Sequence, residues 1–133
     1  MPKAIITRYF TEVWNNRQFA LFDQLLAPTV VGHERNAPDV HGIAEMRQLA
    51  DTFFARFPDA QFTILDLVAE QNTVMVHLRV QATHAATGRA IMVTGMELLR
   101  IANGQISETW SNWDELGLFQ QIGGRVVFDP PSA

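Results

Sequence analysis

The chain has 133 residues, of which 47% are hydrophobic, so residues 1–133 suffice for one domain with a substantial core. Its formal net charge of -4 and its lack of a basic run disfavour binding to nucleic acid or to an anionic membrane. Because it has no cysteine, and no apolar run that fits a membrane span or a signal peptide, we expect a cytoplasmic protein without disulfides or thiolate metal sites.

The first part of the chain has helical periodicity. Apolar residues from Ile5 to Trp14 recur at steps of one and three, which predicts an amphipathic helix that ends near Asn15. The same spacing predicts a short second helix over residues 19–26, which ends before Pro28. Residues 29–33 then predict a short strand.

A third helix follows a loop over residues 36–42. Apolar and aromatic side chains from Ile43 to Phe57 share one side of this predicted helix, and Pro58 closes it. This segment has the most regular helical pattern in the chain.

Beyond Pro58 the hydrophobic period changes to two, which is typical of strands. Residues 62–69, 74–83 and 90–102 predict strands that are joined by turns at Gln71-Asn72 and near Thr87-Gly88. Sequential strands with short turns usually lie side by side, so we expect an antiparallel meander from residue 62 to residue 112.

The last hairpin carries the clearest turn signal. Asn103-Gly104 is a preferred two-residue type I′ turn, which predicts that Ile101 faces Ile106 and that Glu97 faces Trp110. In a regular strand, alternation places two groups of residues on opposite faces: 110 and 112 on one, and 109, 111 and 113 on the other.

Three helices followed by a strongly curved antiparallel sheet indicate an α+β architecture in which the sheet wraps around a helix. Such a cone encloses a pocket between its inner face and residues 5–14. Since the exposed strands of a half-barrel need covering, we expect a homodimer that packs through the open sheet face.

One carboxylate, Asp114, follows two tryptophans and precedes an apolar helix. Removing a carboxyl group from water disfavours its charged form, so Asp114 is a candidate general acid or base. The alternative is a helix N-cap, in which a side-chain oxygen accepts a backbone N–H of the first turn. The two roles are compatible.

Further site candidates are His33 and a set of apolar residues. His33 could polarise a carbonyl group or orient the carboxyl group, or it could be an ordinary half-buried histidine. The candidate walls of the pocket, each of which could also be plain core, are Tyr9, Trp14, Met96 and Trp110. Glu97 and Arg79 fit a solvated strand face or an ion pair, and become pocket groups only if their face turns inward.

Several segments together resemble one known family. They are residues 13–26, Val31-Gly32-His33, residues 83–89, and a terminal signature from Arg100 through Trp110 and Asp114 to Gly123. In order and spacing they resemble the SnoaL-like polyketide cyclases, a branch of the NTF2-like superfamily. The resemblance implies the NTF2-like cone, with a curved antiparallel sheet around three N-terminal helices.

The resemblance also implies a polyketide (ester) cyclase, a cofactor-independent lyase that uses no metal. Asp114 matches the family's acid and base, which closes a ring of a hydrophobic carbonyl compound by an intramolecular aldol reaction. The family usually has a histidine where this chain has Thr109. Two alternatives are an isomerase or dehydratase acting on another apolar substrate, and a protein that binds a small molecule without turnover.

Overall fold

Residues 1–131 are described by a computed structural model of the protein. The helical segments are α1 (Pro2–Arg8), η1 (Tyr9–Asn15), η2 (Phe19–Leu21), α2 (Phe22–Leu25), α3 (Gly42–Arg56) and α4 (Glu115–Gln121). The strands are β1 (Leu26–Glu34), β2 (Val40–His41), β3 (Gln61–Glu70), β4 (Thr73–Thr83), β5 (Ala90–Ala102) and β6 (Gln105–Trp113).

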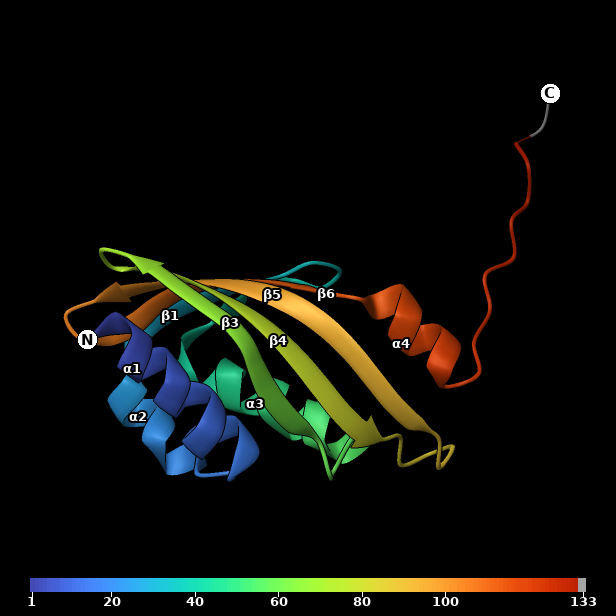
Figure 1. Ribbon diagram of the computed structural model, residues 1–133, viewed down its shortest axis with the longest axis horizontal. Coiled ribbons are helices and arrows are strands. Elements are labelled where there is room, and N and C mark those ends of the chain that lie inside the picture. Colours follow the sequence, from blue (N-terminus) through green and yellow to red (C-terminus); the bar gives the residue numbers. More distant parts are fainter. Residues whose placement is uncertain (132–133) are drawn as a thin grey trace.

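The strands form one curved six-stranded sheet in the order β2-β1-β6-β5-β4-β3, which confirms the predicted α+β class and the meander from β3 to β6. The sheet arches over α1, α2 and α3, and α4 lies at the end where β6 leaves it (Figure 1). The sheet is not wholly antiparallel, because β1 runs parallel to β6. A parallel pair needs a long connection, which the helix α3 and the strands β2 to β5 supply.

The first helix differs from the prediction in its second half. It is α-helical up to Arg8, and from Tyr9 to Asn15 it is a π-helix. This wider turn lets side chains five residues apart meet, and the rings of Tyr9 and Trp14 do so edge to face at 6.3 Å. Single π-turns are frequent at functional sites, which draws attention to this pair.

Strand β1 is longer than the residues 29–33 that the sequence predicts. It begins at Leu26 and passes through Pro28, and its pairing with β6 is irregular between Leu26 and Val31. Proline has no N–H for a regular ladder, so it is tolerated at this irregular stretch. The third helix, in contrast, begins within one residue of the predicted start and ends just before Phe57 and Pro58.

The core lies between the concave face of the sheet and the helices. The side chains of Ile6, Val76, Leu78 and Leu99 are fully buried, and that of Phe10 is 2% exposed. No helix among residues 1–131 is long and apolar enough to cross a membrane.

The hairpin of β5 and β6 contains a bulge that decides what faces the core. Asn103 and Gly104 have φ angles of 52° and 74°, as a type I′ turn requires, and Ile101 pairs with Ile106 as predicted. The register then shifts by one residue, so Glu97 pairs with Ser111, and its predicted pairing with Trp110 is wrong. A β-bulge adds one residue to one strand, and the turn alone does not reveal it.

Candidate functional site

A cavity of about 210 Å³ lies between the concave face of the sheet and the helices η1, α3 and α4. Most of its wall is apolar, and the aromatic members are Tyr9, Phe10, Trp14, Phe53, Phe57, Phe62 and Trp113. The polar members are Glu34, Glu97, Thr109, Ser111, Asp114 and Glu115. An apolar hollow with a few converging polar groups is the usual form of a small-molecule site.

Trp113 forms one wall because β5 has a glycine opposite it. Gly95 is the register partner of Trp113, and a Cβ atom on Gly95 would lie only 2.4 Å from the indole Cδ2. The absence of that atom lets the indole lie flat across β5. Its Nε1 then donates a hydrogen bond of 3.3 Å to Glu97 Oε2.

Two carboxyl groups flank Ser111 on the inner face of the sheet. Ser111 of β6 is the register partner of Glu34 of β1 and also of Glu97 of β5, so the three residues form one row across the sheet. Among the residues that the structure describes, no lysine, arginine or histidine lines the cavity. These carboxyl groups therefore have no cationic partner within it.

The pKa values of both groups respond to this environment. Burial and then the nearby charge of Glu34 raise the pKa of Glu97 to about 8, against the opposing hydrogen bonds from Trp113 and Ser111. Burial and then the charge of Glu115 also raise the pKa of Glu34. Glu97 therefore holds a proton over most of the range around neutrality.

Asp114 lies at the open end of the cavity, where β6 passes into α4. It is exposed, it lines the cavity, and its Oδ1 accepts the backbone N–H of Gly117 at 2.9 Å. A Cβ atom on Gly117 would lie 2.1 Å from Asp114 Oδ2, so the glycine makes room for this cap. The structure thus shows the N-cap geometry, and it places the same carboxyl group at the mouth of the cavity.

Tyr9 and Trp14, two of the candidate wall residues, line the cavity from η1. Burial and then the charge of Glu97 raise the pKa of the Tyr9 hydroxyl above its ordinary value. Trp14 Nε1 is buried and makes no hydrogen bond of good geometry within residues 1–131, although the indole lies close enough to the Tyr9 hydroxyl to lower its pKa. A buried donor without a partner is costly, so an oxygen of a ligand in the cavity would stabilise it.

The other three candidates, His33, Met96 and Trp110, lie outside this cavity. Met96 is 50% exposed, and it is the neighbour of the cavity residue Glu97 on the same strand. His33 and Trp110 are register partners whose rings stack at 4.9 Å on the outer face of the sheet. These three side chains lie outside the cavity because successive residues of a strand point to opposite faces of the sheet, and the neighbours of these residues point inward.

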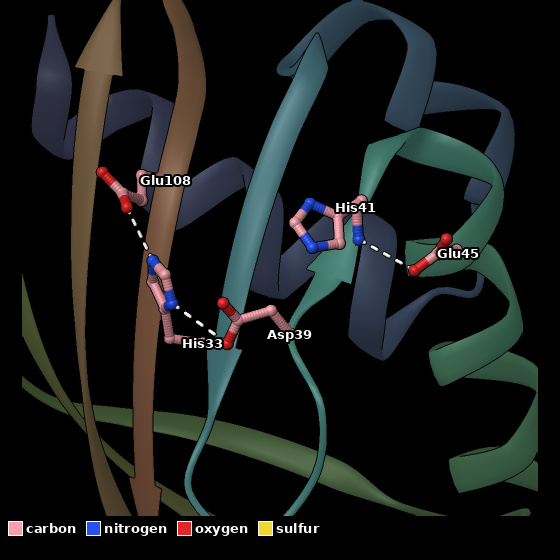
Figure 2. Close-up of polar contacts among 5 residues, drawn as sticks. All are labelled: His33, Asp39, His41, Glu45 and Glu108. Carbon is pink, nitrogen blue, oxygen red and sulfur yellow. Dashed lines mark hydrogen bonds and ion pairs between the residues drawn. The ribbon is translucent and has the colours of Figure 1, made fainter.

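His33 is held between two carboxylates on that outer face (Figure 2). Its Nε2 lies 2.6 Å from Glu108 Oε2, and its Nδ1 lies 3.1 Å from Asp39 Oδ1. The bond to Glu108 is the largest cause of a raised His33 pKa; burial opposes it, and the hydrogen bond and charge of Asp39 add to it. The predicted contact between His33 and the carboxyl group of Asp114 is not part of this arrangement.

The histidines, all of which lie within residues 1–131, are not grouped into a metal site. Figure 2 shows His41 beside α3, where its backbone N–H donates to Glu45 Oε1 at 2.9 Å, and apart from the ion pairs of His33. Within residues 1–131 no three His, Asp or Glu side chains are grouped so that they could hold a metal ion.

Glu97 is the residue that sequence reasoning assigned to a strand face and that the structure places in the cavity. A signal was present in β5, because Glu97 alternates in phase with Val93, Leu99 and Ile101, all of which face inward. Glu34 has the same phase as the buried Val30 and Gly32 of β1. The alternation of apolar residues along each strand thus predicted which side chains face the cavity better than the register counted from the turn did.

An α+β cone that encloses an apolar cavity with carboxyl groups on its wall defines a class of domain that binds small hydrophobic ligands. Residues 4–122 match the family described as SnoaL-like polyketide cyclase. The chain therefore belongs to the SnoaL-like polyketide cyclase family, and its cone is the NTF2-like fold.

Solved structures of low sequence identity share this fold. A candidate SnoaL-like polyketide cyclase from Jannaschia sp. CCS1 has a TM-score of 0.85 at 19% identity, over 92% of each chain. IdmH, a candidate polyketide cyclase from Streptomyces antibioticus, has a TM-score of 0.84 at 23% identity, over 92% of this chain and 99% of its own. AclR, a candidate hydroxylase from Streptomyces galilaeus, has a TM-score of 0.81 at 24% identity, over 92% and 95%. No curated protein matches the chain.

Proposed function

We propose that this protein is a cyclase-type enzyme that closes a ring within an uncharged, hydrophobic carbonyl compound, with Asp114 as its general acid and base. The observation that carries the proposal is the position of Asp114, a carboxyl group at the mouth of an apolar cavity in a chain of the SnoaL-like family. The aromatic wall supports a polycyclic or polyketide-like substrate.

The proposed reaction is an aldol closure within one molecule. The Asp114 carboxylate takes a proton from a carbon that flanking carbonyl groups acidify, and the carbanion then attacks an internal ketone. A carbon–carbon bond forms while the π bond of the ketone breaks, and its electron pair goes to the oxygen. The carboxyl group of Asp114 returns the proton to this alkoxide, so no proton is gained or lost overall. Because both reacting groups belong to one substrate, folding it in the cavity supplies their proximity.

The test is the turnover of an aromatic β-keto methyl ester that carries a ketone in the ortho position of its ring. Enantiomeric excess of the cyclised product distinguishes enzymatic closure from the uncatalysed reaction. Asp114→Asn keeps an N-capping side chain but removes the base, so we expect turnover to fall by about 10²- to 10⁴-fold. Full activity of Asp114→Asn, with an unchanged melting temperature, would rule out the assigned role of Asp114.

A second candidate is a small-molecule-binding protein without turnover, and the bond from Gly117 N–H to Asp114 favours it, since a cap has a structural purpose of its own. An isomerase or dehydratase would use the same carboxyl group on another apolar substrate. Binding of aromatic ketones without conversion of any tested β-keto ester would select the binding protein.

We also propose that the outer face of the sheet packs against a second copy of the chain. Exposed apolar side chains on this face include Val68, Met75, Met92 and Met96, which are 60%, 40%, 53% and 50% exposed. The same face carries charges of both signs, among them Arg100 and Glu108, as a self-complementary two-fold interface requires. Light scattering should report a dimer for the protein and a monomer for Met96→Lys, and a monomeric parent protein would contradict the proposal.

A further inference from the structure

Glu97 is less exposed than Asp114, and the two carboxyl groups accept hydrogen bonds from different donors. Its carboxyl group lies on the inner face of β5, within the cavity, and accepts the Trp113 Nε1–H at 3.3 Å. Its register partner on β4 is the fully buried, apolar Val76. The mechanism described above makes no use of this group.

The titratable groups that face Glu97 from the neighbouring elements are all acidic. The charge of Glu34 on β1 raises the pKa of Glu97, and Glu97 in turn raises the pKa of Tyr9 on η1. Asp114 and Glu115 line the cavity at its α4 end. The part of the wall that α3 contributes is apolar, with Met46, Leu49 and Phe53 as its members. Nothing in this wall favours the ionised form except the two hydrogen bonds from β6, and the net effect is a pKa of about 8.

A neutral carboxyl group has an O–H and can donate a hydrogen bond, which a carboxylate cannot do. Two carboxyl groups in different surroundings can therefore take different roles in one site. The oxygen of the ketone gains negative charge as the carbon–carbon bond forms, and a donor inside a water-poor cavity stabilises that charge more than water does. Trp14 Nε1 is buried near the Tyr9 hydroxyl, makes no hydrogen bond of good geometry, and is a second donor in the same cavity.

We propose that Glu97 is a second catalytic group, which donates a hydrogen bond to the carbonyl oxygen of the substrate while Asp114 moves the proton. This inference rests on the proposed function and deepens it. It also defines the substrate class, because the carboxyl groups of Glu34, Asp114 and Glu115 line the cavity, no cation among residues 1–131 does, and such a wall disfavours an anion. The structure thus assigns an uncharged ketone or ester to the cavity and excludes a free carboxylate.

The experiment measures binding of 2-acetylnaphthalene, an aromatic ketone, against 2-isopropylnaphthalene, which has the same number of non-hydrogen atoms but no oxygen. Quenching of Trp14 and Trp113 fluorescence reports both ligands, since both indoles line the cavity. As the pH rises from 6.5 to 9.5, the affinity of the protein for the ketone should fall by about fivefold or more. This is the effect expected from the loss of one hydrogen bond, because ionised Glu97 can no longer donate. The midpoint should lie near the Glu97 pKa of about 8, and the hydrocarbon should lose less than the ketone.

Two variants separate this role from a structural one. Glu97→Gln keeps a donor and cannot ionise, so it should bind the ketone with an affinity that no longer falls as the pH rises. Glu34→Gln removes the charge that disfavours ionisation of Glu97, so the midpoint should move to lower pH. The Glu34→Gln shift keeps the proposal testable even if Glu97→Gln does not fold.

Two results would overturn the inference: equal pH dependence for the ketone and the hydrocarbon, or a decline that survives in Glu97→Gln. Its failure is distinct from failure of the proposed function, which depends on turnover in Asp114→Asn. In the β-keto ester assay, Glu97→Leu should lower kcat by about 10²- to 10³-fold, as loss of an oxyanion donor does. Unchanged kcat in a folded Glu97→Leu would also refute the role of Glu97.

Discussion

The two faces of the sheet are built from the same strands, but they differ in whether their ionisable side chains have partners of opposite charge. On the outer face His33 contacts Glu108 and Asp39, and Arg100 lies 5.0 Å from the Trp110 ring. On the inner face Glu97 has no cation near it and keeps a raised pKa. Satisfied charges at a surface need no functional explanation, whereas an unpaired acid in a cavity lowers stability and is a candidate for a functional role.

The largest expected contrast between the faces is in packing. Leu99 is fully buried on the inner face, and Leu98, the residue before it in β5, is only partly buried on the outer face. Leu99→Ala should lower the free energy of unfolding by about 2–5 kcal/mol, because it leaves a cavity. Leu98→Ala should cost less than about 1.5 kcal/mol, since the surface around it can relax. Urea denaturation checks both, and equal losses would contradict the assigned faces.

The second contrast is in the pH dependence of stability. The ordinary pKa of Glu97 is 4.5 and its folded value is about 8, so between these values the folded state holds a proton that the unfolded state has lost. The free energy of unfolding should therefore fall as the pH rises from 4.5 to 8, by at most about 1.4 kcal/mol per unit. Glu97→Gln should remove this slope. Denaturation at a series of pH values checks it, and a slope unchanged in the variant would exclude Glu97 as its cause.

A substitution at Gly95 tests whether the absence of a side chain there positions the Trp113 indole in the cavity wall. A Cβ atom on Gly95 would overlap the Trp113 indole, so Gly95→Ala should displace the ring and lower the free energy of unfolding by about 1–3 kcal/mol. The displaced ring should also weaken binding of 2-isopropylnaphthalene, as followed by fluorescence. Thr94→Ala, the exposed neighbour on β5, is the matched control and should change neither property.

Two substitutions at Asp114 test whether its role as a helix N-cap can be separated from its proposed role in catalysis. Asp114→Ala removes the acceptor of the Gly117 N–H and should lower the free energy of unfolding by about 1 kcal/mol. Asp114→Asn should be close to neutral for stability, because asparagine caps nearly as well. Thermal melts of the two variants measure the difference. An Asp114→Asn protein as unstable as Asp114→Ala would show that the cap depends on the charge.

The smallest expected effect is on the outer face. The Glu108 contact raises the His33 pKa above 6.5, so the pair stabilises the fold below that pH and loses this contribution as the pH rises through the folded pKa. Glu108→Gln should cost about 0.5 kcal/mol at pH 6 and almost nothing at pH 9, as expected for a surface pair. Histidine NMR titration should show the His33 pKa falling in this variant. The exposed Glu70→Gln serves as the control, and an equal His33 shift there would refute the assignment.

The alternation of β5 and β6 could be read from the sequence, and so could their turn at Asn103-Gly104. Both are local properties, since a strand has a period of two and a type I′ turn needs residues that tolerate positive φ. The helix over residues 42–56 followed from its 3.6-residue period in the same way. The terminal signature placed Asp114 where a strand meets a helix, as the structure shows.

Other features depended on contacts between distant segments. The bulge that pairs Glu97 with Ser111 lies in the sheet, where Ile101 N–H also donates to the carbonyl oxygen of Asn72, in the turn between β3 and β4, at 2.8 Å. Strand β1, 77 residues away, brings Glu34 beside the same serine. The sequence determined which residues alternate, cap and turn, because those preferences are local. Only the tertiary structure decided which carboxyl groups share a cavity without a cation, because burial and charge proximity depend on every element that packs around them.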